Sequence, residues 1–171
     1  KPDLVVYGKA MGNGYAISCV VGSNNYMKCL NNTFASSTAW TEKVGFAAAE
    51  STIDFFKKNK VNNHINQMGD YIVNEWKNIS KKSGVKIKIG NYKAIPSFKF
   101  DYKNEQKIST IFTYEMLRKK YLATNSIFLS YSHKKKDVDK YLKNFESVFN
   151  ILKKYLKDCK GYEFIKNKRI N

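Results

Sequence analysis

A short stretch near the start of the chain, Pro2-Asp3-Leu4-Val5-Val6-Tyr7-Gly8-Lys9-Ala10-Met11-Gly12-Asn13-Gly14-Tyr15-Ala16-Ile17, determines how the remaining sequence is interpreted. Its apolar, β-branched run at residues 4–6 predicts a buried strand. The glycines at positions 12 and 14 predict a turn after that strand, and a second apolar run at residues 17–21 predicts a strand that returns to the core. Lys9 is therefore expected where a strand opens into a glycine-bordered loop.

A lysine in this position has two interpretations. An amine held at a fixed place in a partly apolar site can become neutral and act as a nucleophile. A surface lysine at a strand end is the commoner case, because lysine is abundant in this chain and lone lysines mostly face solvent. The residues of the stretch by themselves favour the surface lysine.

The length and composition predict a folded protein without a membrane span. A chain of 171 residues provides one domain of ordinary size or parts of two, and its 43% apolar content allows a packed core. The apolar runs are too short to cross a bilayer, and the residues of this sequence do not form the charged, apolar and small-residue pattern of a signal peptide, so none is expected. Because the sequence begins with Lys1 rather than methionine, we expect a fragment or a processed product.

The net charge of +17 suggests a nucleic-acid partner, but the kind of basic residue argues against one. Base and phosphate recognition favours the guanidinium group, and Arg118 and Arg169 are the two arginines of the chain. The lysines are spread along the sequence, so we expect weak, salt-sensitive adhesion to polyanions and no specific nucleic-acid binding.

The cysteines and histidines predict no metal site. The cysteines Cys19, Cys29 and Cys159 are widely spaced, which indicates buried and reduced thiols. The two histidines, His64 and His133, are not at metal-ligand spacing from each other or from a cysteine.

Two helices joined by a polar loop are expected after the first strands. Residues 25–30 predict a short helix, and residues 31–38 form a hydroxyl-rich loop. A longer helix is expected from Thr41 as the N-cap, with Val44, Ala48, Ser51 and Phe55 on one face, and the small residues at 47–49 are expected to let it pack closely against a neighbour. A hydroxyl loop before a helix N-terminus suits an anion, although the residues by themselves favour a plain capping loop.

The remaining sequence predicts a small α+β layer in the order helix, strand, strand, helix, strand, helix. Apolar residues at helical spacing over residues 61–79 predict the most regular helix, which Gly84 ends. Residues 85–89 and 95–100 predict two antiparallel strands, and an amphipathic helix and a third strand are expected at residues 108–121 and 127–129. Asp137 is the expected cap of a final helix with a buried face formed by Val138, Leu142, Phe145, Phe149, Leu152 and Leu156.

Three blocks of the sequence resemble one enzyme family. The opening stretch resembles the cofactor-lysine segment of the class-III pyridoxal-phosphate aminotransferases, and is most similar to the branch of glutamate-1-semialdehyde aminomutase and its aminotransferase relatives. Residues 33–42, Thr-Phe-Ala-Ser-Ser-Thr-Ala-Trp-Thr-Glu, resemble the phosphate-contacting loop of that branch. Residues 122–133 and the following Asp137-Val138-Asp139 resemble its C-terminal strand and last helix. The blocks come in the family's order and span nearly the whole chain.

The resemblance implies specific roles for individual residues. Lys9 falls on the catalytic position that forms a Schiff base with pyridoxal 5'-phosphate and later moves a proton between substrate and cofactor. Thr38 falls on the position that contacts the cofactor phosphate across the interface of a homodimer with shared active sites, and Ser37 takes this role if the alignment shifts by one position. His133 also matches a family position, and we expect a structural role for it.

The resemblance also implies an α/β fold with two parts. Residues 1–58 are the expected end of the large domain of a fold-type-I pyridoxal-phosphate transferase, and residues 59–171 its small C-terminal α+β domain. The family's aspartate that pairs with the pyridine nitrogen, its glycine-rich phosphate turn and its stacking aromatic residue all lie further upstream of the lysine than the eight residues that precede Lys9 here. The chain also has Ala16 where the family usually has a proline.

The expected function is therefore part of an aminotransferase or aminomutase, a cytoplasmic enzyme that acts on a small amino substrate. We expect the 171 residues alone to bind the cofactor weakly and to turn over nothing. Transamination and the isomerisation of a mutase stay equally open. The alternative is a non-catalytic basic α/β module that binds anions or a protein partner.

Overall fold

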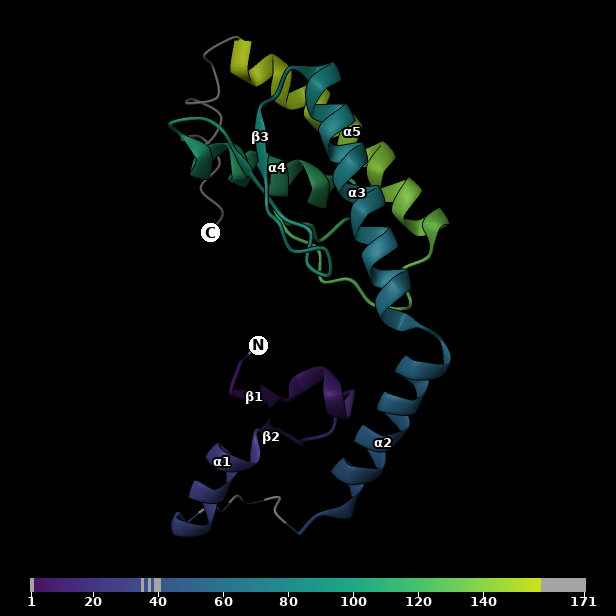
Figure 1. Ribbon diagram of the computed structural model, residues 1–171. Coiled ribbons are helices and arrows are strands. Elements are labelled where there is room, and N and C mark those ends of the chain that lie inside the picture. The colour runs from purple at the N-terminus through teal and green to yellow at the C-terminus, as the bar shows by residue number, and fades with distance from the viewer. Residues whose placement is uncertain (1, 35, 37, 39–40, 158–171) are drawn as a thin grey trace. The chain divides into compact units, whose positions relative to one another are not determined.

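The computed structural model describes residues 2–34, 36, 38 and 41–157 of the chain. The chain contains two compact units, unit 1 at Lys1–Val61 and unit 2 at Asn62–Asn171 (Figure 1). The assignment of residues 1–58 to a large cofactor-binding domain and of residues 59–171 to a small domain stays a prediction.

Unit 1 begins with an antiparallel hairpin of β1 (Leu4–Tyr7) and β2 (Cys19–Gly22), in which Leu4 lies opposite Gly22 and Tyr7 opposite Cys19. The strands form where the sequence predicts them, but the predicted burial is wrong, since Val6 is 72% exposed. Burial requires a covering layer, and the described part of unit 1 supplies little of one. The buried residues of that part are Gly12, Gly45, Ala49 and Val61.

The helices of unit 1 lie close to the predicted positions. The short helical segment is formed by α1 (Asn24–Met27) and a 3-10 turn, η2 (Lys28–Asn32). The long helix is α2 (Lys43–Lys58), which has Glu42 rather than the predicted Thr41 at its N-cap. The buried residues of α2 are small, Gly45 and Ala49, and Ala49 belongs to the alanine run that was expected to allow close packing. Of the residues expected to share one face, Ala48 is half-buried, while Val44, Ser51 and Phe55 are exposed.

Unit 2 contains three long helices and a small sheet. The helices are α3 (Val61–Ser83), α4 (Glu105–Arg118) and α5 (Lys135–Lys157), and the strands are β3 (Ile87–Ile89) and β4 (Phe98–Phe100). Gly84, with a φ of 77°, ends α3 as predicted. The helix α5 begins two residues before Asp137, so this aspartate lies in the first turn and is not the predicted cap.

Aromatic side chains from the helices and the sheet form the core of unit 2. The predicted apolar stripe of α3 and most of that of α5 are buried, which confirms both helix faces, with Ile65 and Leu156 half-buried. The ring of Phe98 on β4 packs edge-on against Trp76 of α3 at 4.9 Å between centroids and against Phe112 of α4 at 5.6 Å. Phe145 and Phe149 of α5 stack on each other at 4.2 Å. The core therefore joins all three helices to the sheet.

The predicted third strand at residues 127–129 is an extended segment rather than a strand. In the antiparallel pair β3–β4, Ile87 lies opposite Phe100 and Ile89 opposite Phe98. The extended segment follows the other edge of β4 through a single bridge between Ser97 and Ser126 and a bond from the Ile127 N–H to the Pro96 carbonyl at 3.0 Å. Pro96 has no N–H to return that bond, so a regular ladder cannot continue.

The cysteines only partly match the expectation of buried thiols. Cys19 is half-buried, whereas Cys29 on η2 is exposed, and both are free. Cys159 lies outside the described residues. The helices of the described segments include none that is long and apolar enough to cross a membrane. Within the same segments, no three His, Cys, Asp or Glu side chains group as metal ligands would.

Candidate active site

Lys9 is the first residue of the 3-10 turn η1 (Lys9–Gly12), directly after β1 and Gly8. Its φ is 50°, in the left-handed region that residues other than glycine seldom adopt. Such a conformation costs on the order of 1–3 kcal/mol and persists where the surrounding structure imposes it. The Met11 N–H donates to the Gly8 carbonyl at 3.1 Å and the Asn13 N–H to the Ala10 carbonyl at 3.1 Å, so the backbone around Lys9 is fixed on both sides.

The loop that carries Lys9 is packed tightly onto itself and onto α2. A Cβ at Gly12 would lie 2.8 Å from Ile17 Cγ2, and one at Gly45 of α2 would lie 2.9 Å from the Ala16 carbonyl oxygen. The Cys19 thiol donates a weak hydrogen bond to Met11 Sδ at 3.7 Å. These close approaches hold the loop, and with it the backbone of Lys9, against the hairpin and the helix.

The turn continues with two residues in the left-handed region, Asn13 at a φ of 47° and Gly14 at 109°. The predicted turn rests on the two glycines and does not include a role for Asn13. The signal was present, because asparagine is among the residues that tolerate this conformation best. The run Gly12-Asn13-Gly14 thus forms the turn after which the loop leads back toward β2.

The amine of Lys9 is exposed, and within the part of the chain that the structure describes it makes no hydrogen bond or ion pair. Its backbone is fixed while its side chain has no protein partner in those residues. This arrangement presents a primary amine at a defined place, which is what a covalent bond to a carbonyl compound requires.

Thr38 lies in a turn between η2 and α2 and is exposed. The alternative residue, Ser37, lies outside the described residues. The contacts of the described residues include none between Thr38 and Lys9, so the structure does not bring these two predicted site residues together within one chain. The N-cap residue of α2, Glu42, makes no side-chain hydrogen bond to the helix.

His133 has the contacts of a structural histidine in unit 2. Its Nδ1 accepts a hydrogen bond from the Ser130 N–H at 3.1 Å, which closes the turn before α5. Its backbone carbonyl lies 2.9 Å from Nε2 of His64 on α3. The ring and the backbone carbonyl of His133 thus both make hydrogen-bonding contacts within unit 2.

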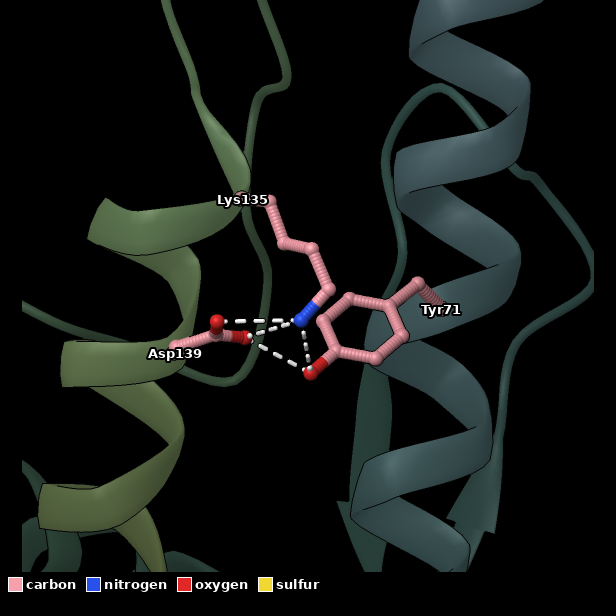
Figure 2. Close-up of polar contacts among 3 residues, drawn as sticks. All are labelled: Tyr71, Lys135 and Asp139. Atoms are coloured by element: carbon pink, nitrogen blue, oxygen red, sulfur yellow. Dashed lines mark hydrogen bonds and ion pairs between the residues drawn. The ribbon is translucent and has the colours of Figure 1, made fainter.

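A second polar cluster in unit 2 consists of Tyr71 of α3 with Lys135 and Asp139 of α5 (Figure 2). The Tyr71 hydroxyl donates to Asp139 Oδ1 at 2.6 Å, and Lys135 Nζ donates to both carboxylate oxygens at 3.1 and 3.0 Å. Lys135 Nζ also lies 4.6 Å from the centroid of the Tyr71 ring, in cation–π contact. The cluster joins the two helices at their surface.

The charges in this cluster shift the titration of its members. The hydrogen bond to Asp139 raises the pKa of Tyr71, and the same bond, together with that from Lys135, lowers the pKa of Asp139. This cluster is not among the sites predicted from the sequence. The spacing of Lys135 and Asp139 predicts a pair on one helix face, but nothing local connects either residue to Tyr71.

The sequence matches the model of the family described as aminotransferase class-III over residues 1–149. The chain therefore belongs to the class-III aminotransferase family, whose members use pyridoxal phosphate. The stated resemblance is thereby confirmed at the level of the family.

Individual relatives include both an aminotransferase and an aminomutase. The 3-aminobutyryl-CoA aminotransferase of Cloacimonas acidaminovorans is 31% identical over 136 residues, which cover 77% of this chain and 31% of the relative. The glutamate-1-semialdehyde 2,1-aminomutase of Methylacidiphilum infernorum is 24% identical over 171 aligned positions, which cover 90% of this chain and 39% of the relative.

Solved structures confirm the α/β fold of the pyridoxal-phosphate transferases. The internal aldimine form of the FumI protein of Sphingopyxis sp. MTA144 matches with a TM-score of 0.84 at 23% identity, over 92% of this chain and 38% of that one. An omega-transaminase of Sphaerobacter thermophilus matches with a TM-score of 0.79 at 14% identity, over 88% and 39% of the two chains. The chain thus spans between 31% and 39% of the length of these four proteins.

Proposed function

We propose that the chain is part of a pyridoxal-phosphate-dependent aminotransferase or aminomutase and that Lys9 is the residue that binds the cofactor covalently. The observation that carries this proposal is the packed loop that fixes the backbone of Lys9, the first residue of η1, with an amine that has no partner in the described residues. The positive φ of Lys9 is shared by the exposed Lys60 and does not by itself set Lys9 apart. The cofactor's aldehyde is the kind of group that a positioned primary amine captures.

When bound, pyridoxal phosphate supplies the electron sink for reactions at the carbon that carries the substrate's amino group. Lys9 would hold the cofactor through its ε-amine. Because the packed loop fixes the backbone of Lys9, the same amine would lie beside the reacting atoms, where it could accept and return a proton. The small residues at positions 12 and 45 serve this role indirectly by keeping the loop in place.

The other parts of the proposal concern the phosphate and the assembly. Thr38, or Ser37 in its place, binds the cofactor phosphate of the partner subunit in a homodimer with shared active sites. The absence of a contact between Thr38 and Lys9 within one chain is compatible with such sharing. The substrate is a small amino compound, and the enzyme is cytoplasmic, which the free thiols of Cys19 and Cys29 support.

The proposal predicts a site to which this chain contributes only a part. Asp3 does not serve as the partner of the pyridine nitrogen, because it precedes β1 and lies too close to Lys9 in sequence. We therefore expect weak cofactor binding and no measurable turnover by the 171-residue chain. Efficient turnover by the purified chain would contradict this part.

Reduction with borohydride in the presence of pyridoxal phosphate tests the role of Lys9. We expect a stable pyridoxyl adduct on Lys9, located by peptide mass spectrometry and lost in Lys9→Ala. Lys60→Ala is the matched control, because Lys60 is also an exposed lysine of unit 1 with a positive φ, 48°. Adducts spread evenly over many lysines would instead favour a non-catalytic basic module.

A further inference from the structure

The outer edge of β3 in unit 2 carries backbone groups without a partner strand. The Gly90 N–H donates to the Ser97 carbonyl at 2.8 Å and the Asp101 N–H to the Lys86 carbonyl at 3.0 Å. Since hydrogen-bonded positions alternate in an antiparallel pair, Lys88 also faces β4, while the N–H and C=O groups of Ile87 and Ile89 point away from it. None of these four groups takes part in a hydrogen bond to another described residue.

The opposite edge of the sheet is already covered. The Phe98 N–H donates to the Asn125 carbonyl at 2.9 Å, and the Leu129 N–H donates to the Ala94 carbonyl at 3.2 Å. The extended segment at residues 125–129 therefore lies along residues 94–98, which lead into β4 and include its first residue. The free edge at β3 has no such segment among the described residues, and edges of this kind readily accept a further strand.

A groove of about 580 Å³ runs beside this edge, between β3 and α3. Half-buried apolar side chains, Val73 of α3 with Ile87 and Ile89 of β3, form part of its lining. The rest of the lining is more polar and consists of Asp70, Lys77, Ser80, Lys81 and residues 90–93.

The charges of the groove favour an acidic occupant. Lys93 is paired with Asp70 at 2.7 Å, which neutralises the single carboxylate of the lining. Lys77 and Lys81, one helical turn apart on α3, are exposed and form no ion pair with any described residue. A second copy of this chain placed edge to edge would bring further lysines to the same groove, so like-charge repulsion disfavours it.

We propose that the free edge of β3 binds an extended acidic peptide as an added strand. The peptide backbone pairs with Ile87 and Ile89, which are separated by about 7 Å along the strand, the spacing of alternate residues in an extended chain. The acidic side chains of one peptide face point toward α3, with their methylene groups over the apolar part of the groove and their carboxylates beside Lys77 and Lys81. Main-chain bonds then provide affinity and the lysines provide selectivity, as in other cases of strand addition. This inference is independent of the role of Lys9.

Fluorescence anisotropy with a labelled probe, acetyl-Glu-Val-Glu-Val-Glu-amide, tests the charge requirement on the full chain. We expect saturable binding that weakens with salt, and a loss of about tenfold in affinity in the double variant Lys77→Glu/Lys81→Glu. The variant Lys136→Glu/Lys140→Glu is the matched control, because it reverses two exposed lysines at the same spacing on α5. Equal loss in both variants, or no binding at millimolar probe, overturns the proposal.

Backbone-methylated probes test the strand pairing separately from the charge. Methylation of the two valine nitrogens and methylation of the three glutamate nitrogens leave the net charge unchanged, but only one set of N–H groups faces β3. We expect one methylated probe to bind and the other to lose binding, and the unmodified probe to protect the Ile87 and Ile89 amides from hydrogen exchange while leaving Lys88 unchanged. Equal binding of both methylated probes overturns the proposal and indicates adhesion to lysines alone.

Discussion

The Tyr71 hydroxyl donates a 2.6 Å hydrogen bond to Asp139 Oδ1 and so connects α3 to the second turn of α5 (Figure 2). The two residues are 68 positions apart in the sequence, and their contact depends on how the two helices pack. Lys135 completes the cluster from the first turn of α5, with its amine 3.2 Å from the Tyr71 oxygen. Because all three side chains are at least partly exposed, we expect their contribution to stability to be small.

We predict that Tyr71→Phe lowers the thermal unfolding midpoint of the chain slightly and raises the pKa of Asp139. The substitution removes the hydroxyl, which is the largest cause of the lowered carboxyl pKa, and keeps the ring beneath Lys135. A carboxyl titration by NMR measures the pKa change. Tyr114→Phe, on α4 and outside the cluster, is the control and leaves the Asp139 titration where it was.

The cluster also predicts how stability varies with pH. The pKa of Asp139 is lower in the folded chain than in the unfolded one, so its contribution is present above the ordinary pKa of an aspartate, about 3.9, and is lost as the pH falls through the lowered folded value. We expect Asp139→Asn to be less stable than the wild type at pH 7, and this difference to shrink as the pH falls below about 3.9, the ordinary pKa of an aspartate. Urea unfolding at pH 7 and at acid pH measures it, and a difference that does not shrink at acid pH contradicts the assignment.

At alkaline pH the contribution of the cluster to stability falls as the pH rises, which is the opposite of its dependence at acid pH. The pKa of Tyr71 is raised by its bond to Asp139, so the contribution of the protonated hydroxyl is present below about pH 10 and is lost as the pH rises through the raised value. We expect the ultraviolet titration of Tyr71, obtained as the difference between wild type and Tyr71→Phe, to move to lower pH in Asp139→Asn. An unchanged titration would show that the Asp139 carboxylate does not raise the pKa of Tyr71.

The stripes of α3 and α5 could be predicted from the sequence, whereas this cluster could not. Apolar residues at helical spacing, such as Ile72 and Trp76, mark the buried face whatever the helix packs against. A contact between two helices distant in sequence requires the register of their packing, which no local pattern contains. The same limit explains α2, where the larger apolar residues predict one face and the close approach of Gly45 to Ala16 selects another.

The candidate site shows the same division between local and non-local information. A lysine between a strand and a glycine-rich turn could be located from the residues, because strand and turn propensities are local. The interpretation of that lysine depended on its resemblance to a family, since the partners of a Schiff-base lysine come from distant parts of a chain. The exposure of β1 was missed for the same reason, because burial depends on what covers a strand and not on the strand's own residues.

Phe98 is the residue of the unit 2 core whose truncation we expect to cost most. It is 2% exposed, and its ring contacts Trp76, Phe112 and Phe145 at 4.9 to 5.6 Å between centroids. Phe98→Ala leaves a cavity among rings from three helices, and we expect a loss of about 3–5 kcal/mol in the free energy of unfolding. Phe128→Ala is the control, because Phe128 is 73% exposed, and we expect a change within about 0.5 kcal/mol. Equal losses in chemical denaturation would contradict the core described above.

The last prediction concerns the loop that holds Lys9. An alanine at position 12 would place its Cβ 2.8 Å from Ile17 Cγ2, closer than real side-chain contacts allow, so Gly12→Ala must displace either the turn or the return segment. We expect the yield of the pyridoxyl adduct on Lys9 to fall in this variant and to recover in the double variant Gly12→Ala/Ile17→Ala, where the clashing methyl group is gone. Peptide mass spectrometry after borohydride reduction measures both yields.

Gly14→Ala separates this packing effect from a general sensitivity of the loop to glycine replacement. Gly14 has no heavy atom within 4 Å of its added Cβ, but its φ of 109° disfavours any side chain. Its defect is therefore one of backbone strain, and Ile17→Ala should not relieve it. If Ile17→Ala restored labelling equally in both variants, the contact between Gly12 and Ile17 would not be what positions Lys9.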